Sequence, residues 1–114
     1  MHELGIVFSI INTVERLATE NHLTKVDSIT LQVGELSGVV PKYVKDCYPA
    51  AIYKSDLLHD TKLKIEFLKA RFICNECGEK FNFKSYKSTC PCCGSSNNTI
   101  IDGKDLIIKQ IEGC

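Results

Sequence analysis

The stretches Cys74-Asn75-Glu76-Cys77-Gly78 and Cys90-Pro91-Cys92-Cys93-Gly94 decide how the second half of this chain folds. Each contains a Cys-x-x-Cys pair followed by a glycine, and twelve residues separate the pairs. In such a pair the chain turns back so that two sulfurs face one point, and the glycine supplies the permissive backbone. Four thiolates that converge tetrahedrally suit zinc, with Zn–S distances of about 2.3 Å. The spacing therefore predicts a zinc ribbon, with structural Zn(II) held by Cys74, Cys77, Cys90 and Cys93.

The segment around these cysteines is poor in large apolar side chains. Residues 71–98 offer only Phe72, Ile73, Phe81, Phe83 and Tyr86. Burying so few groups does not offset the entropy lost when the backbone is ordered, whereas a bound zinc ion contributes folding free energy directly. We therefore expect the ribbon to be unfolded without metal. The alternatives are two disulfides or four cysteines with no shared role.

Composition sets limits on the class of protein. The chain has 114 residues, with 14 basic and 14 acidic side chains and a formal net charge of zero. This balance argues against a nucleic-acid-binding protein, which usually carries a basic excess. No apolar run approaches the ~18 residues that span a membrane, and we expect no signal peptide. Seven cysteines with two Cys-x-x-Cys pairs fit the reducing cytoplasm, where we expect this protein.

The remaining sequence predicts two helices and three long strands. Residues 4–21 form an amphipathic helix whose apolar stripe is Ile6, Ile10, Val14, Leu17 and Ala18, widened by Val7 and Ile11. Pro41 suits the first turn of a second helix, with Val44, Tyr48, Ala51 and Ile52 buried, and Pro49 should kink or shorten it. Residues 25–34, 62–70 and 104–112 are strands, with Leu63, Ile65 and Phe67 facing inward and strict alternation in 104–112.

These elements predict an α+β fold in which two helices lie on one face of a three-stranded mixed sheet. The main domain comprises residues 1–70 plus 104–114, and the zinc ribbon is inserted as residues 71–103. We expect strands 62–70 and 104–112 to pair antiparallel. The helical connection permits strand 25–34 to pair parallel with 62–70. A monomer or a weak dimer is expected.

The first residues, Met1-His2-Glu3, offer a second metal site. The terminal amine and the His2 amide nitrogen close a five-membered ring on a metal, and the His2 imidazole closes a six-membered ring with the same amide. Glu3 can add a fourth donor through its amide or carboxylate. Such planar nitrogen sets favour Ni(II) or Cu(II). The alternative is that His2 is simply exposed, and His22 and His59 show no ligand spacing.

Taken together, the chain resembles the HypA family of hydrogenase nickel-incorporation proteins. The resemblance rests on Met1-His2-Glu3-Leu4, on Gly34-Glu35-Leu36-Ser37-Gly38, on the cysteine ribbon and on the strand after it. It implies a nickel metallochaperone, not an enzyme, that carries Ni(II) as cargo. By this resemblance the chain acts together with the GTPase HypB to deliver nickel to the large subunit of nickel–iron (NiFe) hydrogenase. By the same resemblance, His2 is the nickel ligand and the four ribbon cysteines bind structural zinc. A urease client stays open.

The ribbon departs from some family members in one respect. Those members carry histidines in or beside the ribbon, whereas this chain has Asn97 and Asn98 near the ribbon's end. We therefore expect an all-cysteine zinc site. Cys92 is an additional cysteine that we expect to be an outward free thiol, and neither Cys92 nor Cys114 has an assigned role.

Two other functions fit parts of the sequence. Cys-x-x-Cys-Gly and Cys-Pro-x-Cys-Gly also occur in rubredoxin-like electron carriers, although the twelve-residue spacer is short for them. Lysines interleaved with aromatics, namely Lys80, Lys84 and Lys87 with Phe81, Phe83 and Tyr86, are typical of nucleic-acid-binding ribbons. No phosphate-binding loop and no nucleophile–base pair is evident, so we expect no catalysis.

Overall fold

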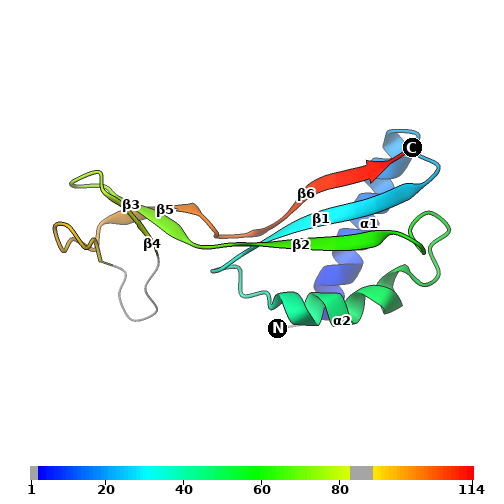
Figure 1. The fold of residues 1–114 in the computed structure, drawn as a ribbon, viewed down its shortest axis with the longest axis horizontal. Helices are drawn as coiled ribbons and strands as arrows, with labels where there is room; N and C mark the ends of the chain where they lie inside the picture. Colours follow the sequence, from blue (N-terminus) through cyan, green and yellow to red (C-terminus); the bar gives the residue numbers. More distant parts are fainter. Residues whose placement is uncertain (1–2, 83–88) are drawn as a thin grey trace.

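A computed structural model describes residues 3–82 and 89–114 of the chain. Their elements are α1 (Glu3–Glu20), β1 (Val26–Gly34), α2 (Pro41–Ile52), β2 (Lys62–Leu68), β3 (Arg71–Cys74), β4 (Lys80–Asn82), β5 (Asn98–Asp102) and β6 (Leu106–Gly113). The molecule is elongated, with extents of 54 × 27 × 16 Å. One end holds both helices and a three-stranded sheet, and the other end holds a second, smaller sheet (Figure 1).

The larger sheet has the strand order β2-β1-β6. β1 pairs parallel with β2, which confirms the parallel pairing, and antiparallel with β6. The predicted antiparallel pairing of strands 62–70 and 104–112 is wrong, because β1 lies between them. β1 is nearly continuously buried whereas β2 and β6 are half-exposed. A strand buried on both faces belongs in the centre of a sheet, so β1 displaces the other two to the edges.

The two helices cover one face of this sheet, as predicted (Figure 1). The buried apolar stripe of α1 is Val7, Ile11, Val14 and Ala18. Val7 and Ile11, which were expected only to widen the stripe, therefore belong to its centre. Val44, Tyr48 and Ile52 are buried along α2. α2 continues through Pro49 to Ile52, because a proline in the last turn removes only one backbone hydrogen bond.

Two apolar positions of the edge strands differ from the simple alternation. Thr30 of β1 pairs with Gln110 of β6, and the next residue of β1, Leu31, pairs with Ile108. Lys109 is therefore an extra residue in β6. This bulge rotates the strand, so that Ile111 joins Leu106 and Ile108 against the core. Phe67 was expected to face inward but is 55% exposed. It lies at the end of β2 that runs toward the smaller sheet, away from the helices (Figure 1).

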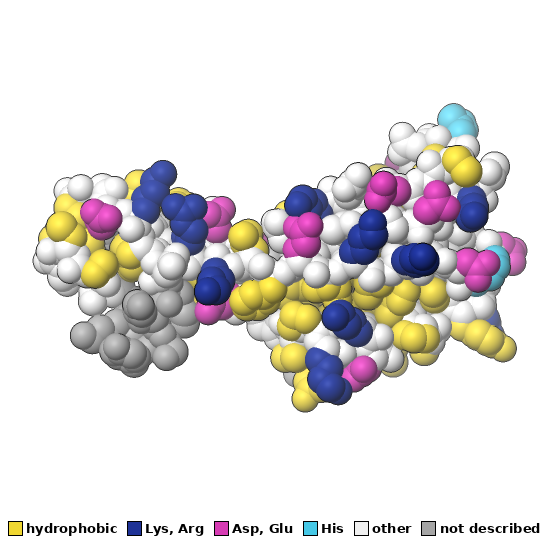
Figure 2. Space-filling view, viewed as in Figure 1, with side chains coloured by type: hydrophobic (Ala, Val, Ile, Leu, Met, Phe, Trp, Pro, Cys, Tyr) yellow, Lys and Arg dark blue, Asp and Glu magenta, His cyan; other side chains and the backbone are white. Residues whose placement is uncertain are grey.

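The opposite face of the larger sheet is covered by charged side chains. Lys64 pairs with Glu112, and Lys109 pairs with Glu66, so ion pairs connect the two edge strands across β1. Figure 2 shows these charges of both signs spread over the sheet, with the apolar side chains gathered below them. Ser28 is small enough to lie buried under the long side chains, where its hydroxyl donates a hydrogen bond to Glu112.

The smaller sheet has the order β4-β3-β5, with both pairings antiparallel. Its packing centres on Phe72, which is 8% exposed and stacks on Phe81 with ring centroids 5.6 Å apart. Phe83 and Tyr86, expected to contribute to this packing, lie outside the described residues, as do Lys84 and Lys87. Among the described residues, neither helix is long and apolar enough to cross a membrane.

A buried hydrogen-bonded chain joins α2 to the sheet and gives a testable prediction. The Tyr48 hydroxyl donates to the Thr61 carbonyl at 2.8 Å, and the Thr61 hydroxyl donates to the Val26 carbonyl at 2.7 Å. Tyr48→Phe leaves the Thr61 carbonyl without this donor, so we expect the free energy of unfolding to fall by about 1–3 kcal/mol. Urea unfolding followed by helical circular dichroism measures this loss.

The same tyrosine predicts a dependence on alkaline pH. Burial raises the pKa of Tyr48 from its ordinary value near 10 to about 12. The unfolded chain therefore releases this proton at lower pH than the native chain, and stability falls as pH rises above about 10. Tyr48→Phe should lack this contribution. Tyr53→Phe, at a side chain 75% exposed, is the control and should leave both measurements unchanged. Equal stability of the wild type and Tyr48→Phe would contradict the assignment.

Candidate metal centre

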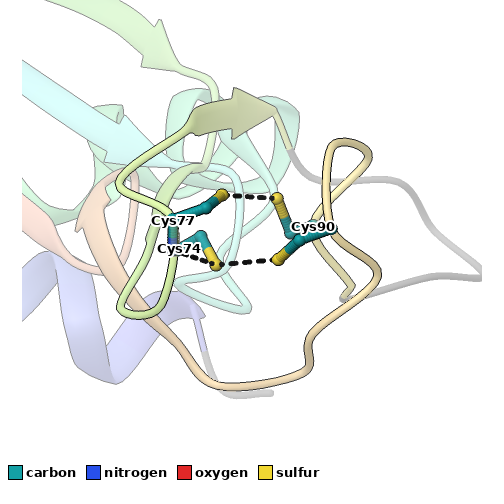
Figure 3. Close-up of side chains that lie close together, drawn as sticks. Cys74, Cys77 and Cys90 are labelled. Atoms are coloured by element: carbon teal, nitrogen blue, oxygen red, sulfur yellow. Dashed lines mark hydrogen bonds between the residues drawn. The ribbon is translucent and has the colours of Figure 1, made fainter.

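Four cysteine sulfurs gather at the far end of the smaller sheet. The Sγ atoms of Cys74, Cys77, Cys90 and Cys93 all lie within 4.8 Å of one another. Cys74 and Cys93 are 3.6 Å apart and Cys77 and Cys90 are 3.5 Å apart, and Figure 3 shows Cys77 and Cys90 pointing at each other from two facing loops. A zinc ion with four sulfurs at about 2.3 Å requires sulfur–sulfur separations of about 3.8 Å. The donor set therefore fits tetrahedral zinc, whereas a disulfide requires about 2.05 Å.

Each Cys-x-x-Cys pair forms the same tight turn. The Gly78 amide donates to the Cys74 carbonyl at 2.9 Å, and the Gly94 amide donates to the Cys90 carbonyl at 2.8 Å. The φ angles of Gly78 and Gly94 are 78° and 77°, in the left-handed region that other residues rarely adopt. The matching geometry shows why a glycine follows each pair: the turn cannot close without it at low cost.

Backbone amides also point at the sulfurs. The Cys77 amide donates to Cys74 Sγ at 3.5 Å and the Cys92 amide donates to Cys90 Sγ at 3.3 Å. The amide of Cys77 is the main cause that lowers the pKa of the Cys74 thiol to about 7. At Cys77 the Glu79 amide lowers the pKa, but hydrogen bonding to Cys90, burial and the other thiols outweigh it and raise the pKa to about 12.

The opposite pKa shifts of Cys74 and Cys77 have an electrostatic explanation. One thiol of the cluster ionises readily, but four adjacent thiolates repel one another unless a cation lies between them. Divalent zinc supplies that charge, and coordination to zinc deprotonates a thiol outright. The arrangement of sulfurs and amides is therefore suited to holding a metal ion permanently, with no open position for a substrate.

A polar contact that the sequence did not reveal fixes the first turn against β5. The Asn75 side-chain amide donates to Asn97 Oδ1 at 3.0 Å, and the Thr99 hydroxyl donates to Asn75 Oδ1 at 3.1 Å. The Asn75 backbone amide also donates to the Asn97 carbonyl at 2.9 Å. Asn97 thus holds the turn rather than a metal. The proximity of Asn75 and Asn97 depends on the pairing of β3 with β5, which no local pattern indicates.

The side chains of the other described cysteines and histidines do not belong to the sulfur cluster. Cys92 and Cys114 are exposed, and Cys47 is half-buried against the core of the larger sheet. His59 is exposed, with its Nδ1 3.1 Å from the Ser55 and Asp56 carbonyl oxygens, which can only accept, and its Nε2 3.2 Å from the Asp60 carboxylate. His22 is exposed, with φ of 58° at the end of α1. None of these residues joins a cluster of metal-binding side chains in the part of the chain that the structure describes.

Of the predicted nickel site, only Glu3 belongs to the described residues. Met1 and His2 lie outside them. Glu3 is the first residue of α1 and its side chain is 8% exposed. The first amides of an α-helix have no acceptor within the helix, so α-helical bonding does not use the Glu3 amide.

Comparison with known proteins gives a consistent result over the full length. Residues 1–113 match the family described as "Hydrogenase/urease nickel incorporation, metallochaperone, hypA". A hydrogenase maturation factor HypA of Prosthecochloris aestuarii is 35% identical over 111 residues, which cover 97% of each chain. The HypA of Geobacter metallireducens is 34% identical over 112 residues, 98% of each chain. The solution structure of the Ni metallochaperone HypA from Helicobacter pylori shares the fold, with a TM-score of 0.74 at 24% identity, covering 99% of this chain and 97% of that one.

Proposed function

This chain belongs to the HypA family, and from that membership we propose that it is a nickel metallochaperone in the maturation of NiFe hydrogenase. The observation that carries the proposal is the match of residues 1–113 to the family, supported by relatives of the same length named hydrogenase maturation factors. The resemblance inferred from the opening residues, the Gly34–Gly38 stretch and the ribbon is thereby confirmed at the level of the family.

The nickel site that we propose lies at the beginning of the chain. His2 is the principal ligand through its imidazole and amide nitrogens, joined by the Met1 amine and by Glu3 through its amide or carboxylate. Support comes from the spacing of these donors in the sequence and from the position of Glu3 at the first residue of α1, where an amide has no acceptor within the helix. Deprotonated amides favour the square-planar field of Ni(II).

The metal that we propose for the four cysteines is structural zinc. Its support is the sulfur–sulfur spacing and the amides that point at the thiols. We accordingly divide the chain into a nickel-binding α/β domain, residues 1–70 plus 104–114, and a zinc ribbon, residues 71–103. Zinc in a closed four-thiolate site exchanges slowly, which suits a scaffold and not a cargo.

The two sites thus have different chemistry. The zinc donors come from two turns whose backbone is fixed by hydrogen bonds. The nickel donors come from one chain end, so a partner can replace them one at a time. A carrier needs this combination of a preformed shape and an accessible cargo. Catalysis, such as GTP hydrolysis, is assigned to a partner and not to this chain.

The partners that we propose follow from the family. They are the GTPase HypB, as the coupled nucleotide hydrolase, and the hydrogenase large subunit, as the recipient of nickel. A urease precursor is the second candidate client, because the description of the matching family names urease beside hydrogenase. We propose neither a nucleic-acid nor a membrane partner, given the zero net charge.

Transfer of nickel tests this function directly. Nickel-loaded protein is mixed with nickel-free large subunit in the presence of a competing chelator that sets the free nickel concentration. We expect the large subunit to gain nickel faster than from a nickel salt buffered to the same free concentration. Nickel-free urease is tested in parallel to identify the client. Equal rates with and without the protein for both recipients would contradict the proposal.

A further inference from the structure

The stretch Gly34-Glu35-Leu36-Ser37-Gly38 lies where the two ends of the molecule join, and the proposed function gives it no role. It connects β1 to α2, beside the place where the chain leaves the larger sheet through Lys69 and Ala70 and returns through Gly103 and Lys104 (Figure 1). We call residues 69–70 and 103–105 the neck. The following contacts show that Gly34–Gly38 binds both strands of the neck.

Successive backbone amides of this stretch donate alternately to the returning and the outgoing strand. The Gly34 amide donates to the Asp105 carbonyl at 3.0 Å, and the Leu36 amide donates to the Gly103 carbonyl at 2.9 Å. Between them, the Glu35 amide donates to the Leu68 carbonyl at 2.9 Å. The stretch therefore continues the central position of β1 for a few residues beyond the sheet.

The Glu35 side chain adds a charged contact to the outgoing strand. Its Oε1 accepts a hydrogen bond from the Ala70 amide at 2.7 Å. Ala70 is fully buried, so this amide has no access to water in the folded chain. A hydrogen bond to a charged acceptor is among the stronger ones in proteins. Ala70 is the last residue before β3, so Glu35 holds the point at which the ribbon begins.

The backbones at the neck are in direct contact. A Cβ atom added at Gly34 would lie 2.5 Å from the Gly103 carbonyl atoms, and one added at Gly103 would lie 2.7 Å from Ala70 Cα. Gly103 also has φ of 80°. Only glycine permits this approach, and a crossing so tightly packed leaves little room for the ribbon to swing.

The other end of the stretch is a hydrogen-bonded turn that leads into α2. The Ser37 hydroxyl donates to the Gly34 carbonyl at 2.7 Å and accepts from the Val39 amide at 3.2 Å. Two residues later α2 begins at Pro41. Val44 of α2 and Val7 of α1 are both fully buried in the same core, so α2 is held against the early turns of α1. The stretch therefore leads from the neck into α2, which packs with α1 in one core.

We propose that Gly34–Gly38 is a clamp that locks the ribbon to the helical domain, with Glu35 as its positioning residue. The two ends of the molecule then move as one rigid body, and a partner meets the ribbon and the beginning of α1 in one fixed arrangement. The proposal concerns the protein without nickel, so it stands or fails independently of the cargo site.

Residual dipolar couplings and amide hydrogen exchange of the zinc-loaded protein test the clamp. In the wild type, couplings from both sheets should fit one alignment tensor, and the Ala70 amide should be protected. In Glu35→Ala the Ala70 amide should exchange about tenfold faster, and the couplings of the smaller sheet should no longer fit the tensor of the larger one. Glu35→Gln keeps an acceptor oxygen at the same reach and should restore most of the wild-type behaviour.

Glu66→Ala is the matched control. It removes an exposed carboxylate from the same sheet, where the partner is the Lys109 side chain and not the neck. Its couplings and its Ala70 exchange should equal those of the wild type. A wild type whose two sheets require separate tensors would overturn the proposal. So would Glu35→Ala with unchanged exchange and couplings, or Glu35→Gln that behaves like Glu35→Ala.

Discussion

Cys77→Ser should release zinc and unfold the ribbon while the helical domain stays folded. Within the described part of residues 71–103, Phe72 is the only large apolar side chain that is buried, at 8% exposure, and the others are half-buried or exposed. Burying one phenylalanine contributes about 1.5–3 kcal/mol, which offsets the ordering of only a few residues at about 1–2 kcal/mol each. Strand hydrogen bonds recover part of the difference, and zinc binding, which supplies about 10–16 kcal/mol in small zinc domains, closes much of what is left. A serine hydroxyl does not replace the lost thiolate.

Zinc content after dialysis and two-dimensional amide spectra measure the two parts of this result. Cross-peaks of β3 and β5 should collapse into the unfolded region, while those of β1 and α1 keep their positions. Cys92→Ser is the control, because Cys92 is exposed, lies outside the sulfur cluster and contributes only its amide, which serine keeps. Full zinc content in Cys77→Ser would show that Cys77 is not a required ligand, and an intact smaller sheet after loss of zinc would show that the metal does not hold the ribbon.

His2→Ala should abolish the planar nickel signature, and so should a chain extended by one glycine before Met1. The first change removes the imidazole, and the second moves the terminal amine out of its five-membered ring. Loss of an outer-shell partner typically lowers metal affinity about 10- to 100-fold. Each of these changes removes a direct donor, so the nickel affinity should fall by more than that. Protons compete with the metal for the amine and the imidazole, so binding should also weaken as pH falls.

Nickel titration followed by absorption and by calorimetry provides the measurement. His59→Ala is the control, because it removes an exposed imidazole that contacts only its own helical turn and Asp60. His22 serves less well, since alanine would be strained at its φ of 58°. Unchanged nickel affinity in either altered chain would remove the site from the beginning of the chain, while leaving family membership and the zinc ribbon intact.

Local patterns were sufficient to predict the elements and the sulfur cluster. The two Cys-x-x-Cys-Gly turns depend on residues within a single turn, and they form as expected. The bounds of α1 and β1 agree with the predicted ones to within one residue and α2 begins at Pro41 as predicted, because helical and strand periodicity are properties of the segment itself.

The errors concern relations between segments. Which strand occupies the centre of the sheet depends on the burial of all three strands together. The predicted pairing of 62–70 with 104–112 was wrong because β1 is more deeply buried than either and lies between them. The bulge at Lys109 arises from pairing with β1, so alternation within β6 alone could not reveal the inward position of Ile111. The contact of Glu35 with Ala70 likewise joins residues far apart in sequence.

The insertion of the ribbon before β6 constrains the order of events during synthesis. β1 needs β6 on one side, and β6 emerges from the ribosome only after the whole ribbon. Until then the nascent helical domain exposes an unpaired edge of its central strand. Zinc capture by the ribbon draws residues 70 and 103 together and thereby lowers the loop-closure entropy that β6 must overcome. Metal binding by the four cysteines would then favour the pairing of β6 with β1 in a new chain.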